Sequence, residues 1–189
     1  MFKIHDFLNK KIFNNIKDIV TSNKLPYYVQ TGLTEGTDGD LLYNLFTHIL
    51  VNENQEIISN AFDSIGKPIV DRIKKMDPYF SKLLRMKVNC YPNQSKPIKS
   101  EYHIDLANNS DYKTLILGIN DTNGYTEFKY KKRPKCKSLA NVAYVFNGNE
   151  KHRSVSQTNT AYRWNININY ETNKLLAPDM PRHTEFIVR

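Results

Sequence analysis

The chain has 189 residues, of which 40% are hydrophobic, and a formal net charge of +8. This length and apolar content fit one domain with a sizeable core, and no internal repeat or long linker indicates a second. No apolar run is long enough to span a bilayer, and the first residues lack the apolar stretch of a signal peptide. The two cysteines have no CxxC spacing and predict no disulfide framework. We therefore expect one soluble domain, residues 1–189, in the cytoplasm, or in the host cytoplasm if the chain is viral.

The N-terminal part of the chain predicts two amphipathic helices. Apolar residues recur at helical spacing over residues 7–20, directly after Asp6, which can cap a helix. A second helix is predicted over residues 65–76, where the Asp77-Pro78 pair ends it. We expect both helices to pack on one face of a sheet.

The segments between these helices are less regular. Residues 26–30 are aromatic and β-branched after a proline, which predicts a short strand. Residues 31–40 contain three glycines among polar residues and are predicted to form a mobile loop. Residues 41–51 suit a helix or a strand, and the 46–51 end favours a strand.

From residue 84 onward the apolar period changes to that of β-strands. An Asn-Gly turn signal at Asn123 and Gly124 separates two of them. Helices followed by about eight short strands predict a mainly β, α+β fold, either a sandwich or a barrel, with the helices on one side. The clearest strands are predicted at residues 84–91, 102–106, 114–120, 125–128, 141–146, 152–157 and 161–170.

A His-x-Asp pair within this β-region has the composition of a metal site. Residues two apart in a strand point the same way, so His103 and Asp105 are predicted to face a common point. His152 opens a later strand and can supply a third ligand. Two histidines and one carboxylate on one face of a metal are typical of non-haem Fe(II) oxygenases. We therefore predict that His103, Asp105 and His152 bind iron and form the catalytic centre.

The last predicted strand offers a binding partner for an anionic cosubstrate. A 2-oxo acid that chelates iron leaves a second carboxylate in the pocket, and a buried anion needs fixed donors. The guanidinium of Arg163 suits this role because it binds a carboxylate through two hydrogen bonds. A hairpin with its turn at residues 158–160 is predicted to bring His152 and Arg163 into one cavity. The polar face of the last strand carries Arg163, Asn165, Asn167 and Asn169, while its alternate apolar residues are expected to face the helices.

Residues 84–170 resemble the catalytic core of the 2-oxoglutarate- and Fe(II)-dependent dioxygenases, within them the prolyl 4-hydroxylase-like group, which includes small members carried by phages. The resemblance implies a double-stranded β-helix, or jelly roll. Residues 1–82 would then support a catalytic core at 83–170, and residues 171–189 would form a tail. The resemblance to this family rests on His103-Ile104-Asp105, His152, Arg163, Cys90-Tyr91-Pro92, and the stretch from Asn123 to Phe128, which is similar to the family's Gly-x-Thr-x-Phe hairpin.

The resemblance also implies cofactors and further site residues. The cofactors are Fe(II), 2-oxoglutarate and O2, with ascorbate as a candidate reductant. Tyr91 and Thr126 are implied to hydrogen-bond 2-oxoglutarate. Gly118 departs from the group, because some animal members place a cosubstrate-binding tyrosine there, so that contact is missing or replaced. The loop at 31–40 corresponds to one that closes over the target peptide and is a candidate lid.

The expected reaction is hydroxylation of a C–H bond, with a prolyl residue in a protein or peptide as the preferred target. A nucleobase or a small molecule is an alternative substrate, although Asn169 replaces the second arginine of the nucleic-acid demethylases in this superfamily. A non-catalytic β-sandwich binding module is a further alternative. A basic run is either a solvated hairpin loop or a contact for nucleic acid or an acidic peptide. It consists of Lys129, Lys131, Lys132, Arg133, Lys135 and Lys137.

The remaining histidines and the cysteines are predicted to have no catalytic role. His5, His48 and His183 lack partners at ligand spacing, so we interpret them as structural or solvated. Cys90 is predicted to be a small core residue, and Cys136 to be exposed in a loop.

Overall fold

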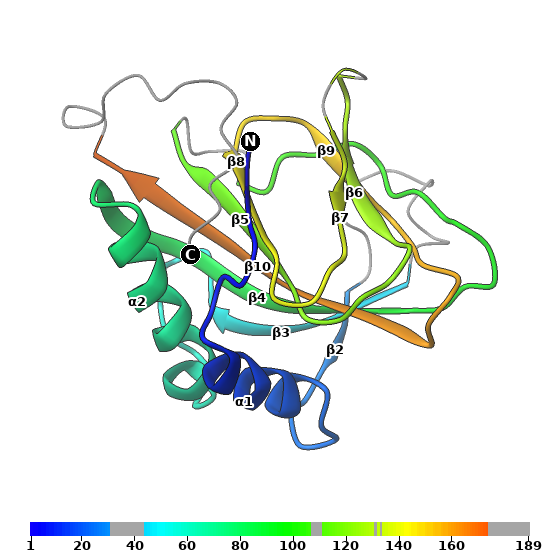
Figure 1. Ribbon diagram of the computed structural model, residues 1–189, viewed down its shortest axis with the longest axis horizontal. Coiled ribbons are helices and arrows are strands. Elements are labelled where there is room, and N and C mark those ends of the chain that lie inside the picture. The colour runs from blue at the N-terminus through cyan, green and yellow to red at the C-terminus, as the bar shows by residue number, and fades with distance from the viewer. Residues whose placement is uncertain (31–43, 107–110, 131, 133, 174–189) are drawn as a thin grey trace.

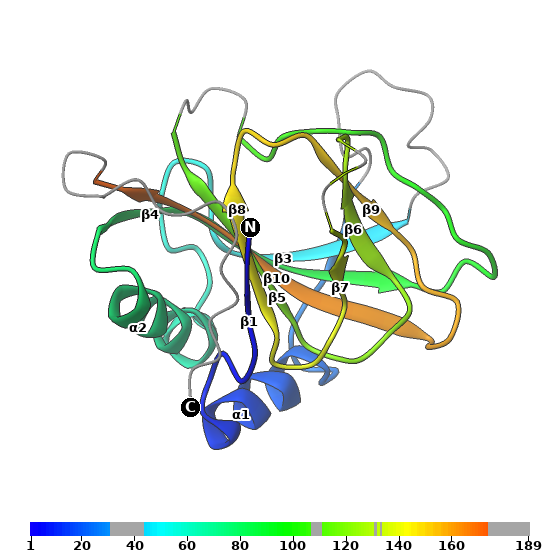
Figure 2. The same ribbon diagram turned by 45° about the horizontal axis from the view of Figure 1, so that its top comes forward.

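The computed structural model describes residues 1–30, 44–106, 111–130, 132 and 134–173, which form two facing antiparallel sheets (Figures 1 and 2). The mainly β fold with flanking helices is confirmed, and the helices lie against the outer face of the larger sheet (Figure 1). In the described part of the chain, the large sheet contains, in spatial order, β1 (Phe2–Ile4), β8 (Ala143–Asn147), β5 (Lys113–Gly118), β10 (Tyr162–Thr172), β4 (Phe80–Pro92), β3 (Leu45–Val51) and β2 (Tyr28–Gln30). The small sheet contains β7 (Cys136–Lys137), β6 (Tyr125–Phe128) and β9 (His152–Val155).

The first helix, α1, spans Lys10–Val20 and begins later than the sequence predicts. Asn9 is its cap, because the Asn9 side chain accepts a hydrogen bond from the backbone N–H of Lys11. The prediction that Asp6 caps this helix is therefore wrong. The cause is a distant contact: Asn141 hydrogen-bonds the backbone of Phe7 and Leu8 and holds both residues outside the helix.

The second helix is α2, Lys67–Met76, and a single π-helical turn, η2 at Phe62–Gly66, precedes it. Ile69 and Ile73 of α2 are buried against the large sheet. Gly66 joins the two segments, and a Cβ at this position would collide with the ring of Phe62. Within the described residues, no helix is both long enough and apolar enough to cross a membrane.

The main core fills the space between the helices and the large sheet. On β10, Ile166, Ile168 and Tyr170 face this core, while the alternate residues point to the opposite side. On β4, Met86 and Val88 do the same. The predicted division of the last strand into an apolar and a polar face is confirmed. It follows from the two-residue period of a strand, which sends successive side chains to opposite sides of the sheet.

Strand 46–51 is confirmed as part of β3, whereas the strand predicted at 102–106 is absent. That segment runs beside β9 and forms only isolated bridges, Lys99 with Val155 and His103 with His152. Between the two bridges the segment advances four residues, from Lys99 to His103, whereas β9 covers only three, from Val155 back to His152. This mismatch interrupts the alternating hydrogen bonds that a continuous ladder needs.

The predicted hairpin between His152 and Arg163 is also wrong. β9, which begins at His152, pairs with β6 in the small sheet, and β10 lies in the large sheet between β4 and β5. Both hydrogen-bonding edges of β10 are therefore occupied. Arg163 instead contacts β9 across the gap between the sheets, through the hydroxyl of Ser154, two residues after His152.

Cysteine and histidine positions agree with the sequence predictions except at Cys136. This residue lies in β7 and is only 3% exposed, because its side chain packs against Met1, with the two sulfur atoms 3.5 Å apart. Cys90 is buried as predicted, and burial raises the pKa of its thiol to about 11. His48 is structural, since its ring nitrogens contact the Pro26 carbonyl and the Ser59 hydroxyl. His5 is exposed. His183 and the predicted loop at 31–40 lie outside the described residues.

Replacement of Ile168 by alanine tests the core. Ile168 is 0% exposed in β10, and the cavity left by Ile168→Ala is expected to lower the free energy of unfolding by about 3 kcal/mol. Ile49→Ala in β3 is the matched control, because Ile49 is 39% exposed and should cost about 1 kcal/mol or less. Urea denaturation followed by circular dichroism measures both. Equal losses would contradict the assignment of Ile168 to the core.

Candidate metal centre and its pocket

Three potential metal ligands converge between the two sheets. One side-chain atom each from His103, Asp105 and His152 lies within 4.8 Å of the others. His103 and Asp105 come from the segment between β4 and β5, and His152 from the first position of β9. Two reciprocal backbone hydrogen bonds of 2.9 Å join His103 to His152, which fixes the two imidazoles side by side with ring centroids 4.9 Å apart.

Backbone contacts hold the segment that carries the first two ligands. The Ser100 N–H donates to the Ser154 carbonyl at 3.0 Å, and the Ser154 N–H donates to the Ser100 hydroxyl at 3.1 Å. Farther along, the Leu106 N–H donates to the Tyr112 hydroxyl at 2.9 Å. The ligand segment is therefore anchored on both sides of His103, although it is not a regular strand.

The tautomer of each histidine follows from its second contact. Nδ1 of His103 lies 3.0 Å from the Glu101 carbonyl, and Nδ1 of His152 lies 2.8 Å from the Glu150 carbonyl. A carbonyl only accepts hydrogen bonds, so each Nδ1 carries the proton. The lone pair then resides on Nε2, and Nε2 of His152 lies 3.8 Å from Oδ2 of Asp105. Such second contacts orient histidine ligands in known metal sites.

The Asp105 carboxylate is only 3% exposed and is surrounded by donors. Its Oδ2 accepts hydrogen bonds from the hydroxyl of Thr114 at 3.3 Å and from the amides of Asn167 at 3.2 Å and Asn169 at 3.1 Å. Its Oδ1 lies 3.2 Å from Nη2 of Arg85. Arg85 in turn donates to Asn169 and pairs with Glu53. This network fixes the carboxylate in one orientation.

The local charges favour the protonation states that bind a metal. Burial alone would raise the pKa of Asp105, but His152 and Arg85 outweigh it and hold that pKa well below the usual range. Burial, together with the neighbouring His152, lowers the pKa of His103. An ionised carboxylate and a neutral imidazole are therefore expected at neutral pH, and these are the ligand forms.

Polar pairs continue from this centre along the inner face of β4 and β10. Asn89 and Asn165 lie in the middle of the row, where the Asn89 amide donates to the Asn165 carbonyl oxygen at 2.9 Å. The row thus runs from the candidate metal ligands to Arg163. In register, the paired positions are Arg85 with Asn169, Lys87 with Asn167, Asn89 with Asn165, and Tyr91 with Arg163.

Arg163 lies at the far end of this row and is only 1% exposed. Its guanidinium donates to the Ser154 hydroxyl and stacks over the Tyr91 ring, 4.1 Å from the centroid. Its Nε has no hydrogen-bond partner among the described residues. Gly124 is needed here, because a Cβ at that position would lie 2.9 Å from Cδ of Arg163. A buried cation with an unused donor fits a carboxylate ligand.

A cavity of about 30 Å³ connects the metal-ligand cluster with this row. The structure thus brings all three predicted metal ligands to one cavity, together with Tyr91 and Thr126. Its lining consists of Leu45, Lys87, Asn89, Tyr91, His103, Asp105, Ile116, Thr126, His152, Ser154, Asn165 and Asn167. A larger cavity of 380 Å³, lined by Met76 and Tyr170 among others, lies away from the candidate ligands.

Sequence reasoning missed the contribution of β4 to this site. Arg85, Lys87 and Asn89 share the inner face with Tyr91, and the alternation of the predicted strand at 84–91 could have placed them there. Burial, with Arg85 nearby, lowers the pKa of Lys87 to about 8. At Gly118, a Cβ would collide with the Leu139 carbonyl, so the backbone leaves no room for a side chain there.

Comparisons with known proteins identify the fold but give no close relative. No protein-family model and no curated protein matches the sequence. A 2OG-Fe(II) oxygenase family oxidoreductase from Burkholderia pseudomallei is 15% identical, with a TM-score of 0.66 over 88% of this chain and 82% of that chain. This chain therefore has the fold of the 2-oxoglutarate- and Fe(II)-dependent oxygenases. The jelly-roll prediction is thereby confirmed.

Two prolyl hydroxylase structures share this oxygenase fold. One, from Trichoplax adhaerens, is in complex with a hypoxia inducible factor peptide fragment; it is 14% identical, with a TM-score of 0.64 over 93% of this chain and 86% of that chain. The other, a prolyl-4-hydroxylase from Pseudomonas putida, is 10% identical, with a TM-score of 0.61 over 90% and 91%. The TM-scores establish the shared fold, and a shared fold does not determine the substrate.

Asn169→Ala tests how the Asp105 carboxylate is positioned. The substitution removes one donor to Asp105 and the acceptor for Arg85, so Co(II) affinity is expected to fall roughly tenfold. Isothermal titration with Co(II) measures the affinity, and a melting curve verifies that the variant folds. Asn15→Ala, at an exposed position of α1, is the control. Unchanged Co(II) affinity in Asn169→Ala would show that this network does not serve the metal centre.

Proposed function

We propose that this chain is a 2-oxoglutarate- and Fe(II)-dependent oxygenase that hydroxylates a prolyl residue in a protein or peptide. The convergence of His103, Asp105 and His152 on one cavity carries the proposal, because no local feature of the sequence forces the third residue to join the first two. In this proposal residues 1–189 act as one catalytic domain. Residues 1–82 support the core at 83–170.

The donor set fits Fe(II). Two imidazole nitrogens and one ionised carboxylate oxygen are the ligands of the facial iron sites of oxygenases, and they leave further positions open to ligands. His103 and His152 would bind through Nε2, since Nδ1 of each contacts a carbonyl. Bound Fe(II) supplies the activation of O2. The protein's own contribution is to hold the two rings and the carboxylate of Asp105 in place.

The opposite end of the row fits the second carboxylate of 2-oxoglutarate. Arg163 would bind that carboxylate through its guanidinium, with the Ser154 hydroxyl and the Tyr91 ring holding the guanidinium in place. Thr126 lines the same cavity on β6 and offers a hydroxyl. We assign Arg163, Tyr91 and Thr126 to cosubstrate binding on this basis. Ascorbate remains a candidate reductant for the assay.

The prolyl target is supported by the two prolyl hydroxylases that share the fold, one of them with a bound peptide. The nucleobase alternative has less support, because Asn169 replaces the second arginine of the nucleic-acid demethylases. Asn169 is also buried and hydrogen-bonded to Asp105 and Thr114. In the basic run, Lys129, Lys132, Lys135 and Lys137 are exposed, as a solvated loop would be, while Lys131 and Arg133 lie outside the described residues. Contact with nucleic acid stays a prediction.

Anaerobic titration tests the enzyme assignment against a non-catalytic binding module. Addition of Fe(II) and then 2-oxoglutarate is expected to produce a weak visible charge-transfer band and, after admission of air, succinate. His103→Ala and Asp105→Ala should abolish both signals, because each removes a ligand. A well-folded wild-type protein without the band would refute the proposal. Mass spectrometry of prolyl peptides and oligonucleotides then identifies the target by a gain of one oxygen or the loss of a methyl group.

Arg163→Ala tests the cosubstrate assignment. Loss of a charged, hydrogen-bonded pair is expected to weaken 2-oxoglutarate binding by about 2–3 kcal/mol, or roughly 30- to 150-fold in Kd. Anaerobic titration of the charge-transfer band measures this Kd. Arg153→Ala is a matched control on β9, because Arg153 pairs with Glu127 and stacks on Tyr102. An unchanged Kd in Arg163→Ala would make the assignment wrong.

A further inference from the structure

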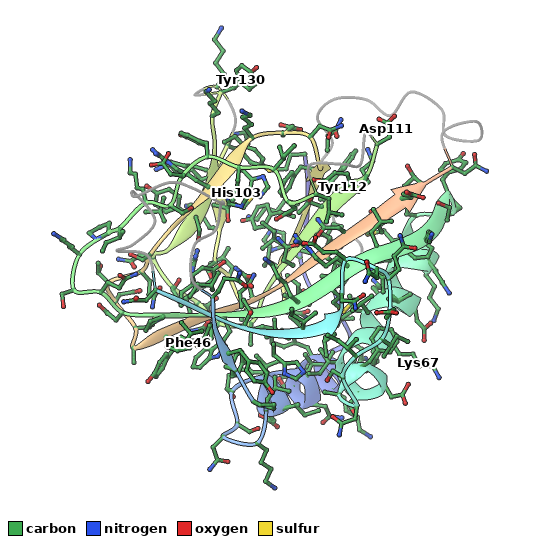
Figure 3. The ribbon with its side chains drawn as sticks, turned by 180° about the vertical axis from the view of Figure 1, so that it is seen from behind. Phe46, Lys67, His103, Asp111, Tyr112 and Tyr130 are labelled. Carbon is green, nitrogen blue, oxygen red and sulfur yellow. The ribbon has the colours of Figure 1, made fainter. Side chains whose placement is uncertain are left out.

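Lys87 is a second cation in the pocket, and the proposed function gives it no role. It lies on the inner face of β4, in register with Asn167 on β10, and lines the same cavity as the three candidate metal ligands. Its side chain points to the side of the sheet opposite the helices, as do Asn89 and Tyr91 on the same strand. Figure 3 shows the two sides, with His103 on one side of the large sheet and Lys67 of α2 on the other.

The Lys87 ammonium has no hydrogen-bond or ion-pair partner among the described residues. Its two neighbours along the inner face of β4 differ from it in this respect. Arg85 pairs with Glu53 and Asp105, and Asn89 donates to Asn165. A half-buried ammonium without a partner is unfavourable, and in known structures such a group is paired or binds an anion.

The charges of the pocket leave room for one more anion. Arg85, Lys87 and Arg163 are cationic, and they are opposed by the carboxylates of Asp105 and Glu53. A divalent metal ion and dianionic 2-oxoglutarate would balance each other. One positive charge then remains, and Lys87 is the cation without a partner among the described residues.

The position of Lys87 separates it from the cosubstrate anchor. The Lys87–Asn167 pair and the Tyr91–Arg163 pair are four residues apart on both strands, or roughly 13 Å at about 3.3 Å per residue. Four carbon–carbon bonds of about 1.5 Å separate the two carboxyl carbons of 2-oxoglutarate, which places them at most about 6 Å apart. A cosubstrate that binds Arg163 through one carboxylate and chelates the metal through the other has both carboxylates engaged, which leaves none of them to pair with Lys87.

We propose that Lys87 binds a carboxylate of the substrate, beside the carbon that is oxidised. This proposal rests on the proposed oxygenase function and narrows its substrate class to prolyl compounds with a nearby carboxylate. Two buried side-chain oxygens support a binding site for such a substrate. Oδ1 of Asn89 and Oδ1 of Asn167 have no hydrogen-bond partner among the described residues. They can accept a hydrogen bond from the amine of free proline or from the N–H of a residue next to proline, since the nitrogen of a peptide-bound proline carries no hydrogen.

The substrate carboxylate could belong to a free amino acid, to the end of a peptide or to an acidic side chain, and three ligands distinguish these cases. The ligands are free L-proline, a peptide that ends in proline, and a peptide with an internal proline next to aspartate. The peptide that ends in proline is also prepared with a carboxyl-terminal amide, which removes the negative charge and preserves the rest. Binding is measured by isothermal titration under anaerobic conditions to the Mn(II) protein with 2-oxoglutarate, so that no turnover is needed.

The wild-type protein is expected to bind at least one carboxylate ligand tenfold or more tightly than the uncharged amide. Lys87→Met, which keeps the length and removes the charge, should abolish this preference and change the Kd of 2-oxoglutarate less than twofold. Lys87→Gln provides a second, polar variant in case the methionine disturbs folding, and Lys82→Met is the control at an exposed position of β4.

Two results would overturn the proposal while leaving the oxygenase function intact. One is equal wild-type affinity for the carboxylate and amide ligands, including failure to bind any of them. The other is a loss of tenfold or more in 2-oxoglutarate affinity in both Lys87 variants, which would assign Lys87 to the cosubstrate. If the wild-type protein binds neither Mn(II) nor 2-oxoglutarate, the proposed function itself fails, and this inference fails with it.

Discussion

A buried carboxylate inside a β-structure needs several fixed donors, and this need organises the inner face of the large sheet. An isolated buried carboxylate would take up a proton and lose its value as a ligand. Asp105 avoids this because Arg85 and the amides of Asn167 and Asn169 surround it. This requirement explains Asn167 and Asn169, which are unusual residues for an interior strand, whereas Asn165 accepts a hydrogen bond from Asn89.

The large sheet separates two environments that use the same two central strands. One face of β4 and β10 packs apolar residues such as Val88 and Ile168 against the helices. The other face carries polar side chains, from Asn169 beside Asp105 to Arg163 at the far end, and the side chains between them line the cavity. Because the helices pack on the strands from behind, the strands give the polar side chains rigid supports.

Recognition in this pocket depends on where its cations lie. Arg163 is rigidly held by Ser154 and Tyr91, which suits the cosubstrate-binding role that we propose for it. Lys87 has a flexible stem and no fixed partner among the described residues, which suits the substrate-binding role that we propose for it. The oxygenase fold does not determine the substrate, so the side chains on the inner face of β4 are the appropriate place to seek specificity.

The sequence by itself determined the residue types of the candidate site and the faces of the strands, because both depend on a two-residue period that is local. It placed Arg163 on a polar face and Ile168 on an apolar one. Only the tertiary structure decided which distant segments meet: Asn141 delays the first helix, β9 pairs with β6, and His103, outside any regular strand, pairs with His152 at the start of β9. Each of these contacts joins residues far apart in the chain and engages a backbone group on at least one side, and backbone groups are nearly the same in every residue, so no local pattern specifies their partners.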